Sequence, residues 1–210
     1  MSAEATDRVV AAFDFDKTVS TRDNVIPFLR LAVGAPRLAW ALARTTPRLA
    51  AAALDDRRRD AAKAALVRRT LADFEGARLT EIATAFADDV VARHLRADVV
   101  ERVEWHRRQG HELVLVSASL APYLDVIGTR LGFDAVLATE LAVDDGGRLT
   151  GELAKPNVRG PEKVRRLEEW LEATTSDDRP AFVWAYGDSA GDRELLARAD
   201  QPISVGRATA

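Results

Sequence analysis

The sequence predicts an α/β protein with a Rossmann-like, three-layer core around a parallel sheet and an all-helical lobe inserted into that core. Three observations lead to this prediction. Short apolar runs typical of buried strands alternate with amphipathic helical segments. Such alternation favours parallel strands joined by right-handed crossovers. After the first strand, however, roughly eighty residues show helical patterning alone, rich in Ala, Leu and Arg.

The first strand is the apolar run that starts at Val9 and reaches Asp14. The next helix is capped by Asp23 or Asn24 and stops at Gly34, because glycine commonly follows the last turn of a helix. A break is expected at 45–47, where two threonines precede a proline. Helices of the inserted block are therefore predicted at 24–31, 36–44, 47–69 and 80–95. We assign residues 21–96 to this lobe, and residues 1–20 and 97–210 to the core.

The rest of the core returns to strand and helix alternation. Turn and stop signals at Gly110, Gly132 and 144–147 divide it into elements. Helices are expected at 97–109, 122–131, 161–171 and 193–199. Strands are expected at 112–116, 181–185 and 203–205, and segments 133–140 and 141–153 read as a hairpin around the turn at 144–147.

Composition narrows the classes of protein to which the chain can belong. The 210 residues carry a net charge of −3, which gives no electrostatic reason to expect a nucleic-acid partner. The absence of cysteine excludes disulfides, thiolate catalysis and cysteine-bound zinc, and it suits the cytoplasm. The first seven residues lack the apolar core of a signal peptide, and no run of 18 uncharged apolar residues predicts a membrane span.

Oxygen-bearing side chains follow three of the predicted strands. Asp14 and Asp16 end the first strand, Ser117 ends the second, and Asp188 follows the strand at 181–185. Ligands of open parallel sheets bind outside the carboxyl ends of the strands, so these groups should meet in one crevice. Burying a carboxylate costs several kcal/mol unless it is paired, so two aspartates one residue apart imply a bound cation. A cation held by carboxylates points to phosphate chemistry.

Lys163 is the basic residue that we expect in this crevice. Only four of the 30 basic residues are lysines, and Lys163 lies in the first turn of a helix, where the helix dipole disfavours a cation. Local rules tend to fail at functional sites. Lys155 is the competing candidate. Lys17 is expected in an exposed turn, and His94, His106 and His111 are read as surface or packing residues because they show no metal spacing and no matched nucleophile.

Four segments in order resemble the motifs of the haloacid dehalogenase superfamily, in its phosphatase branch. They are 14–18 (DFDKT), 117–119 (SAS), Lys163 and 187–192 (GDSAGD). The helical insertion resembles the first-position (C1) cap of that superfamily. The segment 145–151 resembles the hairpin of the phosphoserine-phosphatase-like subgroup, class IB. The resemblance covers most of residues 8–200.

The resemblance implies a Mg²⁺-dependent phosphomonoester hydrolase. Asp14 would be the nucleophile that forms an aspartyl-phosphate, and Asp16 would protonate the leaving group and then activate water. Magnesium would bind the Asp14 carboxylate, the Asp16 backbone carbonyl and Asp188, a set of hard oxygen ligands. The groups expected to orient or neutralise the phosphoryl group are Thr18, Ser117, Ala118 and Lys163, with Asp192 and Ser189 in support. A second alignment, with Asp16 as the nucleophile of a P-type ATPase-like DKT motif, is disfavoured because the strand ends on Asp14.

The sequence leaves the substrate open. A small phosphorylated metabolite is the first reading, and the candidate contacts are Arg22, Asp23, Asn24 and Arg69 (or its neighbour Arg68). Asp23 stands where phosphoserine phosphatases have a glutamate that meets the substrate amine. Residues 36–54 are apolar with interspersed arginines, which suits peripheral membrane contact and a phospholipid head-group substrate. The same residues would also serve phosphotransfer to an alcohol, or a non-catalytic phosphate-binding regulatory module.

Overall fold

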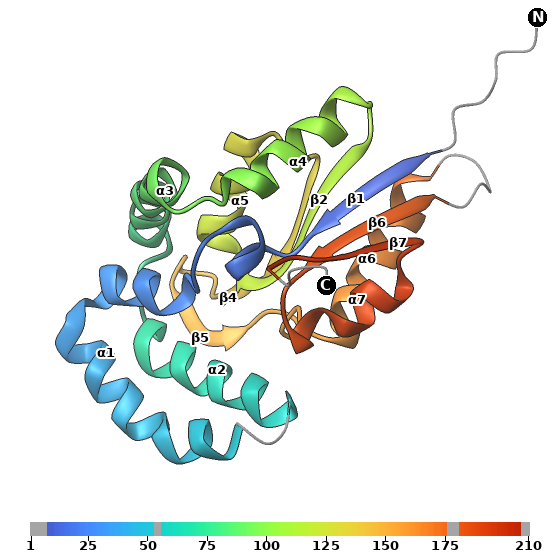
Figure 1. The fold of residues 1–210 in the computed structure, drawn as a ribbon. Helices are drawn as coiled ribbons and strands as arrows, with labels where there is room; N and C mark the ends of the chain where they lie inside the picture. Colours follow the sequence, from blue (N-terminus) through green and yellow to red (C-terminus); the bar gives the residue numbers. More distant parts are fainter. Residues whose placement is uncertain (1–7, 53–55, 176–180, 207–210) are drawn as a thin grey trace, which may run out of the picture.

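A five-stranded parallel sheet forms the centre of the molecule (Figure 1). The computed structural model describes residues 8–52, 56–175 and 181–206, without side-chain detail at 46–52 and 56–57. The strand order is β3-β2-β1-β6-β7, and each neighbouring pair is parallel. The strands are β1 (Val9–Phe13), β2 (Glu112–Leu120), β3 (Ala135–Thr139), β6 (Phe182–Gly187) and β7 (Gln201–Ser204).

Helices cover both faces of this sheet, as Figure 1 shows. Side chains of β1 alternate between two apolar clusters: Ala11 and Phe13 pack on one side, and Val10 and Ala12 on the other. The first cluster includes residues of α4 (Ala97–Arg108) and α5 (Ala121–Leu131), and the second includes residues of α6 (Pro161–Thr174) and α7 (Arg193–Arg198). Because both faces of the inner strands β1, β2 and β6 are covered, these strands are mostly apolar. The predicted three-layer α/β core is confirmed.

Three helices lie between β1 and β2 in the sequence: α1 (Val25–Ala52), α2 (Asp56–Leu71) and α3 (Gly76–Arg93). Figure 1 shows α1 and α2 side by side at one end of the sheet, and the two helices pack against each other. Aromatic rings join this group to the core. Phe28 of α1 lies 4.8 Å from Tyr123 of α5, and Phe86 of α3 lies 5.2 Å from the same ring, measured between centroids. These contacts fix the helical group over the carboxyl ends of the strands.

The break expected at 45–47 is wrong, because α1 continues as a helix to Ala52. Thr45 is fully buried and donates a hydrogen bond to the Ala41 carbonyl, 2.7 Å away. Leu38, Ala41 and Thr45 are buried and α1 packs against α2, and this burial outweighs the one backbone donor that Pro47 lacks. The interruption lies instead at Gly34, whose φ of 79° only glycine adopts readily. The helix predicted at 47–69 is therefore divided between α1 and α2.

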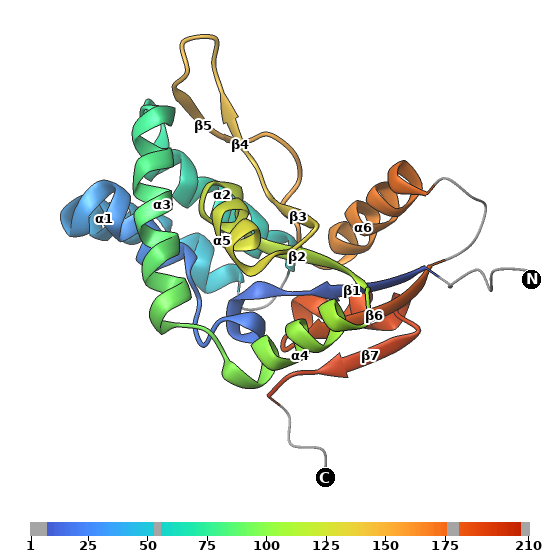
Figure 2. The same ribbon diagram turned by 90° about the horizontal axis from the view of Figure 1, so that it is seen from above.

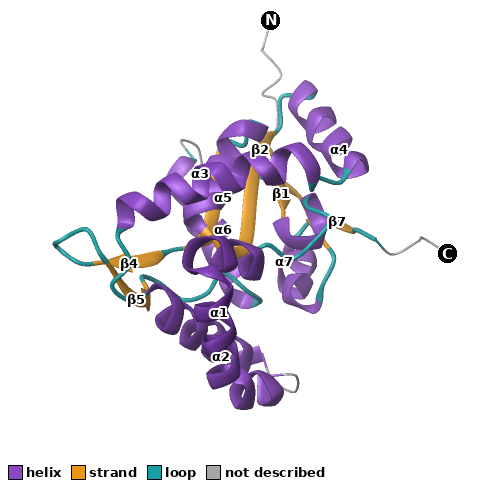
Figure 3. Ribbon diagram, turned by 90° about the vertical axis from the view of Figure 1, so that its left-hand side faces the viewer, coloured by secondary structure: helices purple, strands orange, loops and turns teal. Residues whose placement is uncertain are grey.

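The predicted hairpin is only half correct. The segment at 133–140 contributes β3 to the central sheet beside β2, while β4 (Leu141–Val143) and β5 (Leu149–Leu153) form the antiparallel hairpin. Figure 2 shows this hairpin projecting away from the sheet, and Figure 3 shows it beside the lobe helices. The Gly76 N–H donates to the Gly147 carbonyl at 2.9 Å, which ties the tip of the hairpin to α3.

Strand β2 is longer than predicted. It runs from Glu112 to Leu120 with an irregular register after Val116, so Ser117 lies within the strand rather than at its end. The remaining predicted elements are present with bounds shifted by a few residues.

Among the described helices, the segment Val25–Thr45 of α1 is long and apolar enough to span a bilayer. Core helices of soluble proteins pass the same test. In this segment, 22% of the apolar 18-residue window is buried.

Candidate active site

Side chains from distant parts of the sequence meet at the carboxyl ends of β1, β2 and β6. Asp14 follows β1, Ser117 lies in the last part of β2, and Asp188 follows β6. Lys163 reaches them from the first turn of α6. Together they surround a pocket of about 160 Å³. The residues that line it are Asp14, Asp16, Lys17, Asp23, Ser117, Ala118, Arg159, Lys163, Asp188, Ser189, Gly191 and Asp192.

The chain turns sharply after β1 and after β6. After β1 it enters a short helical turn, η1 (Phe15–Val19), in which Lys17 has a φ of 62°. This left-handed residue redirects the backbone just after Asp14 and Asp16, both of which line the pocket. After β6, a Cβ on Gly187 would lie 2.5 Å from the Asp192 Cβ, so a larger residue there would displace Asp192. The glycine before Asp188 is thus a packing requirement of the site.

Lys163 lies between two buried carboxylates. Its Nζ is 2.5 Å from Asp14 Oδ1 and 2.5 Å from Asp192 Oδ1. Burial would lower the pKa of the ammonium, but the two carboxylates outweigh that effect and raise it. Burial raises the pKa of Asp14 to about 6, although Lys163 acts in the opposite direction. Burial also acts to raise the pKa of Asp192, but Lys163 and the Ser189 hydrogen bonds outweigh it, so this pKa is lowered.

Asp16 has a different environment, although it is only two residues from Asp14. Burial raises the pKa of Asp16 to about 7. Asn24 donates to Asp16 Oδ1 through its backbone N–H (3.1 Å) and its side-chain amide (2.7 Å). The Ser119 hydroxyl donates to Asp16 Oδ2 at 2.8 Å. A carboxyl group with a pKa near neutrality and a fixed orientation can both donate and accept a proton.

Three carboxylates form a group suited to a divalent cation. One ligand oxygen from each of Asp14, Asp188 and Asp192 lies within 4.8 Å of the others. Burial raises the pKa of Asp188, as does the charge of Asp192. The Thr18 hydroxyl donates to Asp188 Oδ1 at 3.3 Å. Because carboxylate oxygens are hard ligands, the donor set fits Mg²⁺.

A second chamber of about 230 Å³ adjoins the pocket and shares Asp16, Asp23, Ala118 and Arg159 with it. Its other walls come mainly from α1 and α2: Val25, Arg59, Asp60, Ala62, Lys63 and Leu66, together with Asn157. Burial lowers the pKa of Lys63 to about 7. The helical lobe therefore supplies much of the space beside the pocket.

Sequence reasoning missed four residues with direct roles in this geometry. They are Asn24, Lys63, Ser119 and Arg159. A signal for Lys63 was present, because it is one of only four lysines among 30 basic residues. Asn24 was read as a helix cap and a possible substrate contact rather than as a donor to Asp16, and Ser119 was noted only as part of the motif at 117–119. Arg159 gave no signal in the sequence.

Several predicted substrate contacts lie outside the pocket. Arg22 lies 3.8 Å from Asp89, and Arg69 donates to the Ala65 carbonyl of its own helix. Neither lines either chamber, and the same is true of Arg68 and Thr18. Asp23 lines both chambers, and its carboxylate lies 3.4 Å from the Lys17 ammonium. Lys155 lies on the surface, 3.2 Å from Glu140.

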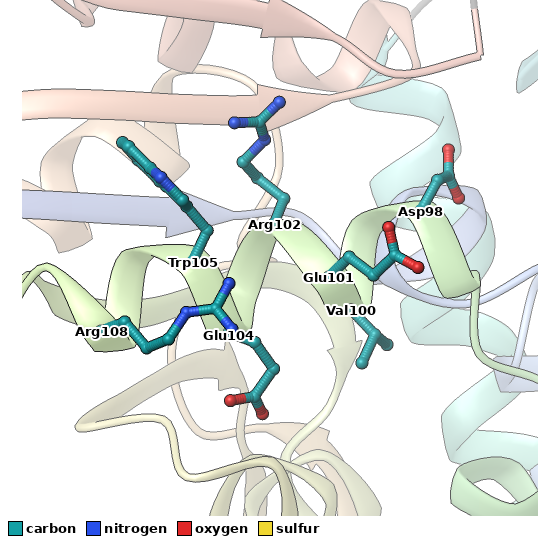
Figure 4. Close-up of a pocket in the computed structure, with 7 residues that line it drawn as sticks. All are labelled: Asp98, Val100, Glu101, Arg102, Glu104, Trp105 and Arg108. Atoms are coloured by element: carbon teal, nitrogen blue, oxygen red, sulfur yellow. The ribbon is translucent and has the colours of Figure 1, made fainter.

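A larger hollow of about 510 Å³ lies elsewhere, on the exposed side of α4 (Figure 4). All seven residues that line it belong to that one helix. They include Arg102, whose guanidinium stacks over Trp105 at 5.5 Å. No predicted catalytic residue lines this hollow, so the smaller pocket remains the candidate site.

Comparisons with known proteins agree with this geometry. The family model of haloacid dehalogenase-like hydrolases matches residues 11–197. Protein CicA of Caulobacter vibrioides is 37% identical over 193 residues, which cover 92% of this chain and 84% of that protein. Phosphoserine phosphatase of Archaeoglobus fulgidus is 32% identical over 104 residues, which cover 50% of this chain and 29% of that enzyme. The structure of a Bordetella pertussis protein of unknown function superposes with a TM-score of 0.80 at 25% identity, covering 95% of this chain and 90% of that one.

Proposed function

Since the chain belongs to the haloacid dehalogenase-like hydrolase family and is a phosphatase similar to phosphoserine phosphatases, we propose that it hydrolyses a small phosphomonoester through a phosphorylated Asp14. The observation that carries the proposal is the placement of Asp14. Its carboxylate lies in the pocket with Lys163 at 2.5 Å and with Asp16 as a second lining carboxyl.

Asp14 attacks phosphorus in this mechanism. A pKa of about 6 leaves its carboxylate mostly ionised at neutral pH, as a nucleophile requires. Lys163 and the Ser117 hydroxyl stabilise the phosphoryl oxygens, where electrostatic positioning supplies most of the catalysis. Asp16 protonates the leaving alcohol and then removes a proton from the water that hydrolyses the aspartyl-phosphate. A pKa of about 7 suits both steps.

Asp14 and Asp188 of the carboxylate group would hold Mg²⁺, with the Asp16 backbone carbonyl as the ligand that the family resemblance adds. When bound, the metal would offset the negative charge of the phosphoryl group. Asp192 positions Lys163 through their 2.5 Å contact. The Ser189 N–H and hydroxyl donate to Asp192 Oδ2 at 3.0 and 2.7 Å, so Ser189 in turn holds Asp192. We further propose that residues 21–96 act as a lid over the pocket, since α1 and α2 provide walls of the adjoining chamber.

Hydrolysis of p-nitrophenyl phosphate, with and without Mg²⁺, tests the proposal. Wild-type protein should turn over only with the metal, and Asp14→Asn should lose activity by at least about 10³-fold because the amide is a poor nucleophile. Equal rates for the two proteins would refute the role of Asp14. Magnesium binding without turnover of any substrate in a broad panel would favour a binding module, and product analysis with an added alcohol would detect phosphotransfer.

One observation favours a second candidate, a phosphatase that acts on a phospholipid head group. Three large apolar side chains of α1 are exposed to solvent: Ile26, Leu31 and Trp40 are 40%, 54% and 53% exposed. The helix contains four arginines and no acidic residue, in a chain whose net charge is −3. A cationic, apolar helix face suits the surface of an anionic bilayer. The last part of the predicted contact segment, at 53–54, lies outside the described residues.

Vesicle sedimentation separates the two candidates. The protein should pellet with vesicles that contain phosphatidylglycerol, and it should stay in solution with phosphatidylcholine alone. Trp40→Ala should weaken the binding, because aromatic side chains anchor interfacial helices. Absence of binding to anionic vesicles at low salt would leave the small soluble phosphomonoester as the substrate class.

A further inference from the structure

A lysine of the helical lobe crosses into the core beside the pocket. Lys63 of α2 donates to the Ala118 carbonyl of β2, to Asn157 Oδ1 at 2.5 Å and to Thr139 Oγ1 at 3.2 Å. An ammonium group has three N–H donors, and here each faces an oxygen of the core. The contact with Ala118 is the one that reaches the site, because Ala118 lines the pocket.

The core also donates a hydrogen bond to helix α2. The Asn157 side-chain amide donates to Asp60 Oδ1 at 2.6 Å, and Asp60 lies three residues before Lys63 on α2. The Thr139 hydroxyl lies 2.9 Å from Asn157 Oδ1 and 3.1 Å from the Ala118 carbonyl, so it joins the other two acceptors of Lys63. Lobe and core are therefore linked by a closed polar network rather than by a single ion pair.

The peptide between Ala118 and Ser119 is linked to two hydroxyl groups, those of Ser117 and Ser119. Its carbonyl belongs to the peptide whose N–H is that of Ser119, and this N–H donates to Ser117 Oγ at 3.2 Å. The Ser119 hydroxyl donates to Asp16 Oδ2 at 2.8 Å and accepts from the Tyr123 hydroxyl at 2.8 Å. A shift of this peptide would move both a phosphate-binding hydroxyl and the hydrogen bond that orients Asp16.

We propose that Lys63 is a positioning residue through which helix α2 of the lobe orients Asp16 for proton transfer, acting through the Ala118 peptide and Ser119. The proposal rests on the phosphatase mechanism above. It implies that the lobe does more than cover the pocket: only with α2 seated is the hydrogen-bond chain from Lys63 to Asp16 complete. A purely structural lysine would anchor α2 without affecting the proton transfer itself.

Leaving groups of different basicity distinguish these two roles. Phenolate is a much stronger base than p-nitrophenolate, so hydrolysis of phenyl phosphate depends more on protonation of the leaving group. In Lys63→Met, kcat/KM for phenyl phosphate should fall at least about tenfold further than kcat/KM for p-nitrophenyl phosphate. Ser119→Ala should change the ratio in the same direction, and the double variant should show little additional change because both act on Asp16. Lys155→Met, at an exposed lysine outside the network, should keep the wild-type ratio.

The outcomes separate this proposal from the phosphatase assignment. Turnover by the wild type that Asp14→Asn abolishes supports the assignment alone. An unchanged ratio in Lys63→Met, with both substrates slowed equally, would overturn the positioning role and leave a structural anchor. If Lys63→Met does not fold, Asn157→Ala removes one of its acceptors and should give a smaller shift of the ratio in the same direction. No turnover by the wild type would overturn both.

Discussion

Replacement of Lys163 by methionine should both unfold the protein more easily and abolish its activity. Methionine is close to lysine in length and volume, so the change mainly removes one positive charge and its donors. The Asp14 and Asp192 carboxylates, each 2.5 Å from Lys163 Nζ, would then share a buried site without a counter-charge. Removing one partner of a buried ion pair typically costs about 3–5 kcal/mol.

The lower end of that range applies here. Asp192 keeps two hydrogen bonds from Ser189, and Asp14, whose pKa is already raised by burial, can take up a proton. A loss of about 3 kcal/mol corresponds to a decrease in Tm of roughly 7 °C, given an unfolding entropy of about 2.1 cal/mol/K per residue over a chain of this length. A protonated Asp14 is no nucleophile, so activity should fall by at least about 10³-fold.

Thermal unfolding followed by circular dichroism, in EDTA, measures the first effect, and p-nitrophenyl phosphate hydrolysis with Mg²⁺ measures the second. Lys155→Met is the matched control, since Lys155 and Glu140 form an ion pair with side chains 53% and 38% exposed. Such a pair contributes less than about 1 kcal/mol, or roughly 2 °C. Equal Tm values for the two variants would refute the argument from burial.

Three further predictions concern other parts of the molecule. Burial lowers the pKa of His106 from 6.5 to about 4. Between these pH values the unfolded chain binds a proton at His106 and the folded chain does not. Through His106 the protein should lose about 2 kcal/mol of stability as the pH falls from 6.5 to 4, so in urea unfolding at the two pH values the wild type should lose more stability, or gain less, than His106→Gln by about that amount. Gly187→Ala should reduce phosphatase activity at least about tenfold, because the added Cβ would displace Asp192. The control is Gly128→Ala, whose Cβ would lie 2.4 Å from Val136 Cγ2, away from the pocket. This variant should have a lower Tm and unchanged activity. Asp188→Asn should raise the Mg²⁺ concentration for half-maximal activity at least about tenfold, measured by metal titration of p-nitrophenyl phosphate hydrolysis.

Specific results would contradict each of these three. Equal losses of stability in the wild type and in His106→Gln would show that His106 does not cause the loss at low pH. Equal activity of the Gly187 and Gly128 variants would show that the contact with Asp192 is unimportant. An unchanged magnesium requirement in the Asp188 variant would remove that carboxylate from the cation site.

Sequence patterns predicted the core well because its inner strands contain continuous apolar runs, and such runs are typical of strands covered on both faces. The sequence patterns gave wrong predictions where tertiary packing determines the local structure. Pro47 marks a helix end by local rules, yet α1 continues past it, and Thr45 just before it is fully buried. The segment before Glu140 resembles half of a hairpin, but β2 offers it a parallel partner instead.

The linear sequence determined which groups could act: the two aspartates after the first strand, a lysine in an unfavourable first helical turn and a glycine before Asp188. Only the tertiary structure decided how they act on one another. Burial raises the pKa values of both Asp14 and Asp16, and a lysine from 149 residues further along the chain lies against the first of them. The contact of Lys63 with the pocket likewise depends on how α2 packs. The cost of removing a charge from water depends on all surrounding atoms, and most of those atoms belong to residues remote in the sequence.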